Sequence, residues 1–203
     1  MFSLIQAAGW PIWPLILASV IALAIIAERL WSLRGGLVMP KGLLMQAVHE
    51  FRQNGANEAS ITRLANGSPL GQILAAGIRN IQSTPAIMKE SIEETGRAVA
   101  ANLERFLNTL GTIAAIAPLL GLFGTVVGMI EIFGAASPTG SSNPTQLAHG
   151  ISIALYNTAF GLVVAIPSMI FYRYFRGKID NLLLDMELQG AKLVEILHGD
   201  RQA

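Results

Sequence analysis

The chain has 203 residues, of which 52% are hydrophobic and only 13% are charged, and its formal net charge is +1. Soluble domains carry about 25% charged residues, so the composition favours a membrane protein, and the near-neutral charge excludes an overall basic character suited to nucleic acid. The absence of cysteine excludes disulfides, thiolate nucleophiles and cysteine-based metal sites.

The first apolar segment predicts a transmembrane helix over residues 12–31, preceded by an outer N-terminal segment, residues 1–11. No Lys or Arg precedes the helix, which favours a retained span over a cleaved signal peptide. Glu28 and Arg29 are adjacent, so we expect their side chains to point in different directions and to reach the inner interface. Aromatic residues favour membrane interfaces, and three tryptophans stand near the ends of this span: Trp10, Trp13 and Trp31.

Residues 32–105 are predicted to form a helical region on the inner side of the membrane. Within it, Thr84 is suited to cap a helix whose first residue is Pro85. Nothing in the sequence clearly stops this helix before the second span, so we expect one long helix that projects from the membrane. Its weakest points are Gly96, Gly111 and Pro118.

Two further segments approach the length needed to cross a bilayer, which is about 20 residues. They predict transmembrane helices over residues 106–133 and 150–172, joined by a short outer loop, residues 134–149. Residues 173–203 predict an amphipathic helix that packs on the long helix or on a neighbouring subunit. Its apolar residues recur at helical spacing: Ile179, Leu182, Leu183, Met186, Leu193 and Leu197.

The basic residues predict the orientation of the chain. All 14 Lys and Arg residues lie at the inner end of the first span, between the first two spans, or after the third. Loops on the cytoplasmic side carry an excess of these residues, so we place the N-terminus outside and the C-terminus in the cytoplasm. The predicted fold is an all-α, multi-pass membrane protein with three transmembrane helices and long cytoplasmic helical extensions.

Small and polar residues form one stripe on each of the last two spans. Polar groups within a span usually face other protein or a wet cavity. Close helix packing explains such stripes, since a Thr hydroxyl can bond its own i−4 carbonyl; the lining of a central cavity, or a groove for a partner helix, explains them as well. Asn157 favours the cavity or groove, because one carbonyl cannot satisfy an amide. The stripes consist of Gly121, Thr125 and Gly128 in one span, and of Ala154, Thr158, Gly161 and Ala165 in the other.

Glu131 stands at the outer end of the second span, where it is either at a pore mouth or a simple interfacial charge. His149 opens the third span, and we expect a solvated end residue there rather than a proton relay. The sequence contains no phosphate-binding loop, no H-E-x-x-H and no G-x-S-x-G motif. We therefore expect no enzyme activity, no metal site and no cofactor.

Two stretches, "LNTLGTIAAIAPLLGLFGTVVGMIEIF" and "GISIALYNTAFGLVVAIPSMIFYRYF", resemble the MotA/TolQ/ExbB proton-channel family, on its ExbB/TolQ side. The resemblance implies a multi-pass protein of the bacterial inner membrane, with its outer segments in the periplasm. It also implies a homopentamer around single-span partner helices of the ExbD or TolR type. Proton flow would then energise TonB-dependent transport or Tol–Pal envelope work. The two pore-lining threonines of the family fall on Thr125 and Thr158.

One position departs from the family pattern. Many members read G-I-x-E-A-L at the start of the third span, whereas this chain has Ile153 in place of the glutamate. The resemblance then implies that the partner's Asp supplies the titrating group, and that Thr125, Thr158 and Asn157 solvate it. Two alternatives stay open: a non-conducting scaffold for the partner complex, and a ring coupled to another ion. A channel that works alone is disfavoured, because no span brings its own buried ionisable residue.

Overall fold

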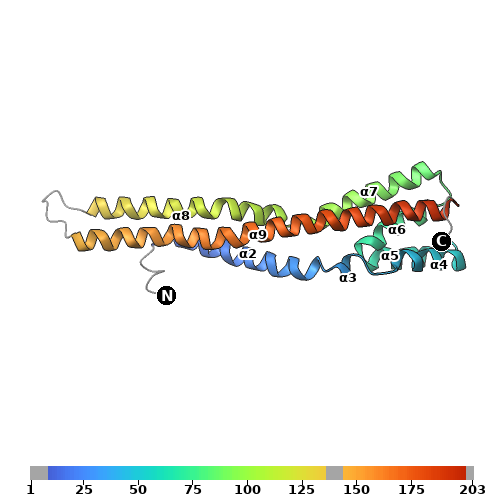
Figure 1. Cartoon of the computed structure of the whole chain (residues 1–203), viewed down its shortest axis with the longest axis horizontal. Coiled ribbons are helices and arrows are strands. Elements are labelled where there is room, and N and C mark those ends of the chain that lie inside the picture. Colours follow the sequence, from blue (N-terminus) through green and yellow to red (C-terminus); the bar gives the residue numbers. More distant parts are fainter. Residues whose placement is uncertain (1–8, 136–143, 200–203) are drawn as a thin grey trace. The chain divides into compact units, whose positions relative to one another are not determined.

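The computed structural model describes residues 9–135 and 144–199, and within them every regular element is a helix (Figure 1). The helices are α2 (Ile12–Ser32), α3 (Gly35–Val38), α4 (Leu43–Asn54), α5 (Glu58–Gly67), α6 (Pro69–Arg79), α7 (Pro85–Leu103), α8 (Leu107–Ala135) and α9 (Pro144–Leu197). The prediction of an all-α protein is confirmed for this part of the chain. Most of the expected N-terminal segment and half of the expected outer loop lie outside the described residues, while residues 134–135 belong to α8 and residues 144–149 to α9.

Three helical stretches are long and apolar enough to cross a membrane, judged by length and composition: Ile12–Ser32, Pro85–Gly134 and Gly150–Leu197. Only 28%, 22% and 35% of the residues in their most apolar windows are buried within the chain. Large apolar side chains such as Leu17, Leu119 and Val163 are more than half exposed. Water would penalise so much apolar surface, so these helices need lipid or other protein around them.

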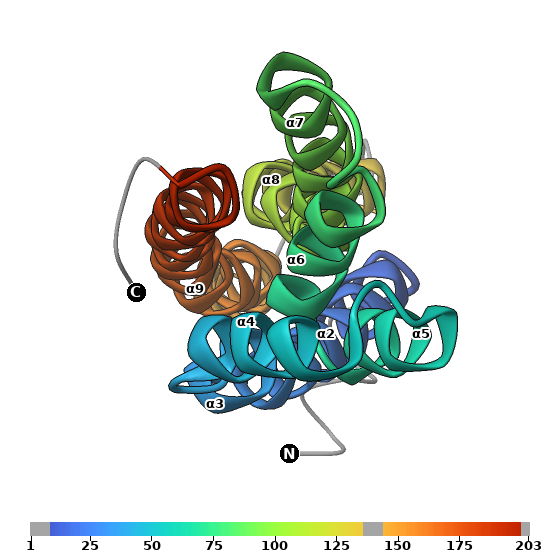
Figure 2. The same ribbon diagram turned by 90° about the vertical axis from the view of Figure 1, so that its right-hand side faces the viewer.

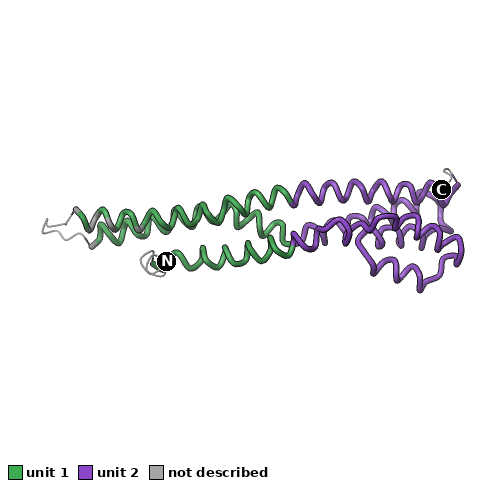
Figure 3. Tube along the Cα trace, turned by 60° about the horizontal axis from the view of Figure 1, so that its bottom comes forward, with its two compact units in different colours: residues 1–28, 106–174 green, residues 29–105, 175–203 purple. Residues whose placement is uncertain are grey.

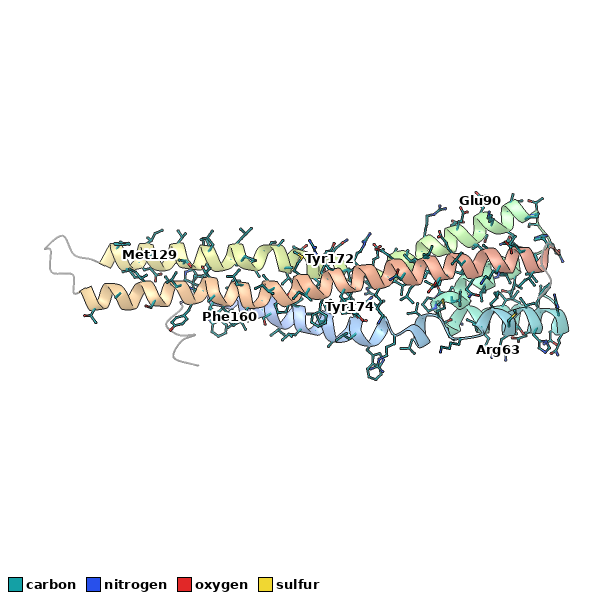
Figure 4. All side chains as sticks on the ribbon, viewed as in Figure 1. Arg63, Glu90, Met129, Phe160, Tyr172 and Tyr174 are labelled. Atoms are coloured by element: carbon teal, nitrogen blue, oxygen red, sulfur yellow. The ribbon has the colours of Figure 1, made fainter. Side chains whose placement is uncertain are left out.

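The chain divides into two compact units, drawn in green and purple in Figure 3. Unit 1 comprises residues 1–28 and 106–174, and unit 2 comprises residues 29–105 and 175–203. In unit 1, a core cluster of Leu15, Ala117, Val164 and Ala165 joins α2, α8 and α9. Phe160, labelled in Figure 4, packs against this cluster.

In unit 2, α6 contacts α4, α5 and α7, and Figure 2 shows it between the α4–α5 pair and α7. Side-chain oxygens cap the starts of three helices, where backbone N–H groups lack partners. Ala59 N donates to Asn57 Oδ1 (3.0 Å), Gly71 N to Ser68 Oγ (3.1 Å), and Ile87 N to Thr84 Oγ1 (3.4 Å). The predicted cap at Thr84, with Pro85 as the first helical residue, is confirmed.

The end of α9 packs within unit 2 through one apolar face, as its helical spacing predicts. The buried residues of that face are Phe175, Ile179, Leu182, Met186, Leu193 and Ile196. A Cβ atom on Gly190 would lie 2.9 Å from Ile92 Cγ2, and one on Gly77 would lie 2.8 Å from Leu193 Cδ2. Glycine at these two positions therefore lets α9 approach α6 and α7 closely. At the surface, Arg63 (labelled in Figure 4) pairs with Glu50 at 3.2 Å.

The prediction of one uninterrupted helix from Pro85 through the second span is wrong. Helix α7 ends at Leu103, α8 begins at Leu107, and Phe106 between them has φ of 64°. A non-glycine residue in this left-handed conformation cannot continue a right-handed α-helix. The expected weak points Gly96, Gly111 and Pro118 all remain helical.

Arg29, at the inner end of the first span, is buried within the chain. Arg29 is only 5% exposed, and its Nη1 atom donates a hydrogen bond to the carbonyl oxygen of Leu103 at 3.0 Å. The last four carbonyls of a helix lack intrahelical donors, and Leu103 is the last residue of α7. The guanidinium of Arg29 therefore satisfies the C-terminal end of α7, while Glu28 stays exposed.

Candidate functional site

The two threonines of the small-residue stripes lie next to each other. Thr125 of α8 and Thr158 of α9 have their Oγ1 atoms 2.5 Å apart, and either hydroxyl can donate to the other. Thr125 Oγ1 also lies 3.1 Å from the carbonyl oxygen of Ala154 and 3.2 Å from that of Gly121. One consistent arrangement has Thr158 donating to Thr125, which donates in turn to a carbonyl. The pair therefore forms a hydroxyl bridge between two apolar helices.

Glycines on both helices make this bridge possible. A Cβ atom on Gly121 would lie 2.7 Å from the carbonyl oxygen of Asn157, and one on Gly161 would lie 2.6 Å from that of Ala117. Contacts this short with backbone atoms exclude any side chain. Gly128 approaches Ala154 in the same way, with 3.1 Å between its hypothetical Cβ and Ala154 Cβ.

Within one chain, the two stripes thus face each other and hold α8 against α9. This is the packing arrangement of small residues that membrane helices use. Ala165 lies further along α9 and belongs to the core cluster with Leu15. That these residues also line a pore, or contact a partner helix, stays a prediction.

Asn157 is buried, with 1% of its surface exposed, whereas its neighbour Tyr156 is 47% exposed. The amide packs on Gly124, where a Cβ atom would lie 2.8 Å from Asn157 Cβ and 3.0 Å from Asn157 Nδ2. Gly124 thus provides the space for the amide, although sequence reasoning did not single it out. The available signal was its spacing, because Gly121, Gly124 and Gly128 share one face of α8 at i, i+3 and i+7.

A cavity of about 130 Å³ adjoins this contact in unit 1. Its wall includes Gly124, Gly128 and Glu131 from α8, Ala154 and Asn157 from α9, and Pro11 from the segment before α2. The structure therefore brings Glu131 and Asn157 to one space, which is large enough for a few water molecules. His149 and Ile153 both lie in α9, but their side chains are outside the described part of the structure.

The segment before α2 is fastened to α8 by aromatic contact. The rings of Trp10 and Phe123 meet edge to face, with centroids 5.8 Å apart, which is a favourable geometry for aromatic pairs. Among the described residues, no group of three or more His, Cys, Asp or Glu side chains is placed to hold a metal ion. The polar groups gathered here are two hydroxyls, one amide and one carboxylate.

Comparison with known proteins places the site in a family. Residues 65–188 match the model of the MotA/TolQ/ExbB proton channel family, and this range includes every residue of the threonine bridge and its glycines. Biopolymer transport protein exbB1 of Vibrio cholerae is 34% identical over 172 residues, which cover 81% of this chain and 74% of that protein.

Two further relatives carry the name biopolymer transport protein ExbB. The one from Aquifex aeolicus is 35% identical over 114 residues, covering 56% of this chain and 76% of its own length. The one from Salmonella typhimurium is 41% identical over 90 residues, covering 44% of this chain and 37% of its own length. The chain therefore belongs to the MotA/TolQ/ExbB proton channel family, as an ExbB/TolQ-like member.

Proposed function

We propose that this chain is the channel subunit of a proton-driven stator in a bacterial inner membrane. It works with a single-span partner of the ExbD or TolR type and energises TonB-dependent transport or Tol–Pal-type envelope work. The N-terminus is periplasmic, and the connection at residues 32–105 and the segment at residues 173–203 are cytoplasmic, as the basic residues indicate. The observation that carries the proposal is the hydroxyl bridge between Thr125 and Thr158 in two otherwise apolar spans.

The bridge suits an ion path that needs a carboxylate from outside the chain. Each hydroxyl can donate one hydrogen bond and accept two, so the pair can stabilise either a protonated or an ionised carboxyl group. Neither α8 up to Ile130 nor α9 from Gly150 to Tyr172 contains Asp, Glu, Lys or Arg. The proton-binding group at this depth is therefore the Asp of the partner helix, and Asn157 supplies a further polar contact.

Exposed apolar surface supports assembly with lipid and with further copies of the chain. At least 65% of each most apolar window is not buried within one chain, which leaves apolar surface for lipid, the partner helix and further copies. We assign a homopentamer on the strength of the family. The glycine and alanine stripes (Gly121, Gly128, Ala154, Gly161 and Ala165) then fix how α8 and α9 sit together around the partner helices.

The combined variant Thr125→Val and Thr158→Val tests this function. Valine keeps the shape of threonine but has no hydroxyl, so we expect the ring to assemble while partner-dependent transport is lost. Thr112→Val is the matched control, because Thr112 lies on the same helix, is exposed, and bonds only its own helix at Asn108 O (2.8 Å). Full transport activity in the double variant would mean that the two threonines serve packing alone.

A non-conducting scaffold is the second candidate function, and Ile153 is the residue that favours it, since an isoleucine cannot hold a proton. In that case the double threonine variant and the wild type would support partner assembly equally, and neither would pass ions. A ring coupled to another ion would give flux of that ion in place of protons.

A further inference from the structure

Glu131 lines the cavity beside Asn157 and is the one carboxylate in a long stretch of the sequence. Between Phe106 and Tyr172, Glu131 is the only Asp or Glu residue in the chain. It lies in the last turns of α8 and is exposed, yet it also lines the cavity that the buried amide of Asn157 reaches. Glu131 thus lies between the surface of the chain on one side and the cavity in unit 1 on the other.

The cavity adjoins the threonine bridge through Ala154. Glu131 is six residues from Thr125 on α8, a distance of about 9 Å along a helix. Asn157 and Ala154 line the cavity, and the carbonyl oxygen of Ala154 lies 3.1 Å from Thr125 Oγ1. Glu131 and Asn157 thus line one cavity together with Gly124 and Gly128, and Ala154 connects the wall of that cavity to the threonine pair.

We propose that Glu131 is the proton-collecting carboxylate at the outer entrance of the ion path, and that the Glu131–Asn157 cavity is the vestibule through which it delivers protons toward Thr125 and Thr158. This inference rests on the proposed function and adds a residue to it. The segment before α2 forms the outer wall of the vestibule through Pro11, held in place by the contact between Trp10 and Phe123.

The experiment measures proton flux into liposomes that contain the full chain with its single-span partner. We expect Glu131→Gln to lower flux by at least about tenfold, as expected for loss of a positioned proton-transfer group, and Glu131→Asp to lose less. Glu90→Gln removes an exposed carboxylate from α7 of unit 2 and should change nothing (Figure 4).

A second measurement does not depend on a substitution. A hydrophobic carbodiimide added to the assembled wild-type complex should modify Glu131 and block flux in parallel, as mapped by mass spectrometry. Unchanged flux in Glu131→Gln, or modification of Glu131 without loss of flux, overturns the inference and leaves the proposed function standing. No flux in the wild-type complex overturns the proposed function, and this inference with it.

Discussion

Thr125 and Thr158 share a hydrogen bond across two apolar helices, with 2.5 Å between their Oγ1 atoms. The bond exists because Gly121 and Gly161 allow the two backbones to meet. Hydrogen bonds of this kind contribute about 0.5–1.5 kcal/mol to stability. In a double-mutant cycle of Thr125→Val and Thr158→Val, we therefore expect a coupling energy in that range, measured by thermal unfolding in detergent. Additive effects of the two substitutions would show that the hydroxyls do not depend on each other.

Gly161 should be intolerant of any side chain. A methyl group there would lie 2.6 Å from Ala117 O and 3.1 Å from Gly121 Cα, so Gly161→Ala must push α9 away from α8. Overpacking costs about 1–3 kcal/mol, and we expect a lower midpoint of thermal unfolding together with loss of transport.

Gly177 is the matched control on the same helix, because nothing lies within 4 Å of its hypothetical Cβ atom. Gly177→Ala should stabilise α9 by up to about 1 kcal/mol through helix propensity. Equal effects of the two alanine substitutions would contradict the close contact at Gly161.

Phe106 occupies a backbone conformation that glycine adopts without strain. Its φ of 64° costs a non-glycine residue on the order of 1 kcal/mol. We expect Phe106→Gly to be more stable than Phe106→Ala by about that amount, which reverses the order found inside helices. Both variants lack the aromatic ring, so its loss cancels in the comparison of their unfolding midpoints. A more stable alanine variant would indicate a continuous helix from α7 into α8.

Arg29 should stabilise the end of α7. Its buried guanidinium donates to Leu103 O at 3.0 Å, and hydrogen bonds to charged groups contribute about 1.5–3 kcal/mol. Arg29→Met removes the guanidinium but leaves an unbranched side chain of similar length. In this variant, amide hydrogen exchange should become faster in the last turn of α7.

Arg79→Met serves as the comparison for Arg29→Met. Arg79 pairs with Glu58 at 2.7 Å, but both side chains are more than half exposed, and such pairs contribute at most about 1 kcal/mol. If hydrogen exchange in α7 becomes as fast in the Arg79 variant as in the Arg29 variant, the contact of Arg29 with Leu103 does not specifically stabilise the end of α7.

Composition and spacing predicted the coarse structure well. A helix that crosses a bilayer needs about 20 mainly apolar residues, which is why the three spans could be identified. Thr84 followed by Pro85 is a local signal, and the cap at α7 needed no tertiary information. The apolar face of the end of α9 followed from helical spacing, because that spacing places residues on one side of a helix.

The features that escaped prediction depend on contacts between distant residues. Glu104, Arg105 and Phe106 are ordinary helix residues, and no propensity marks the turn that separates α7 from α8. The burial of Arg29 depends on Leu103, which lies 74 residues away along the chain. Likewise, Glu131 could be seen as a charge near the end of a span, but the cavity that it shares with Asn157 arises only when α8 and α9 pack together.

The measurement that tests the central claim most directly is proton uptake into liposomes under an imposed pH gradient. The liposomes contain this chain alone, this chain with its single-span ExbD/TolR-type partner, or the complex in which the partner's membrane Asp is replaced by Asn. We expect flux only with the unaltered partner, because the chain brings bridging hydroxyls but no carboxylate at their depth. An assembled wild-type complex that passes no protons, or a chain that conducts equally well alone, would contradict the proposal.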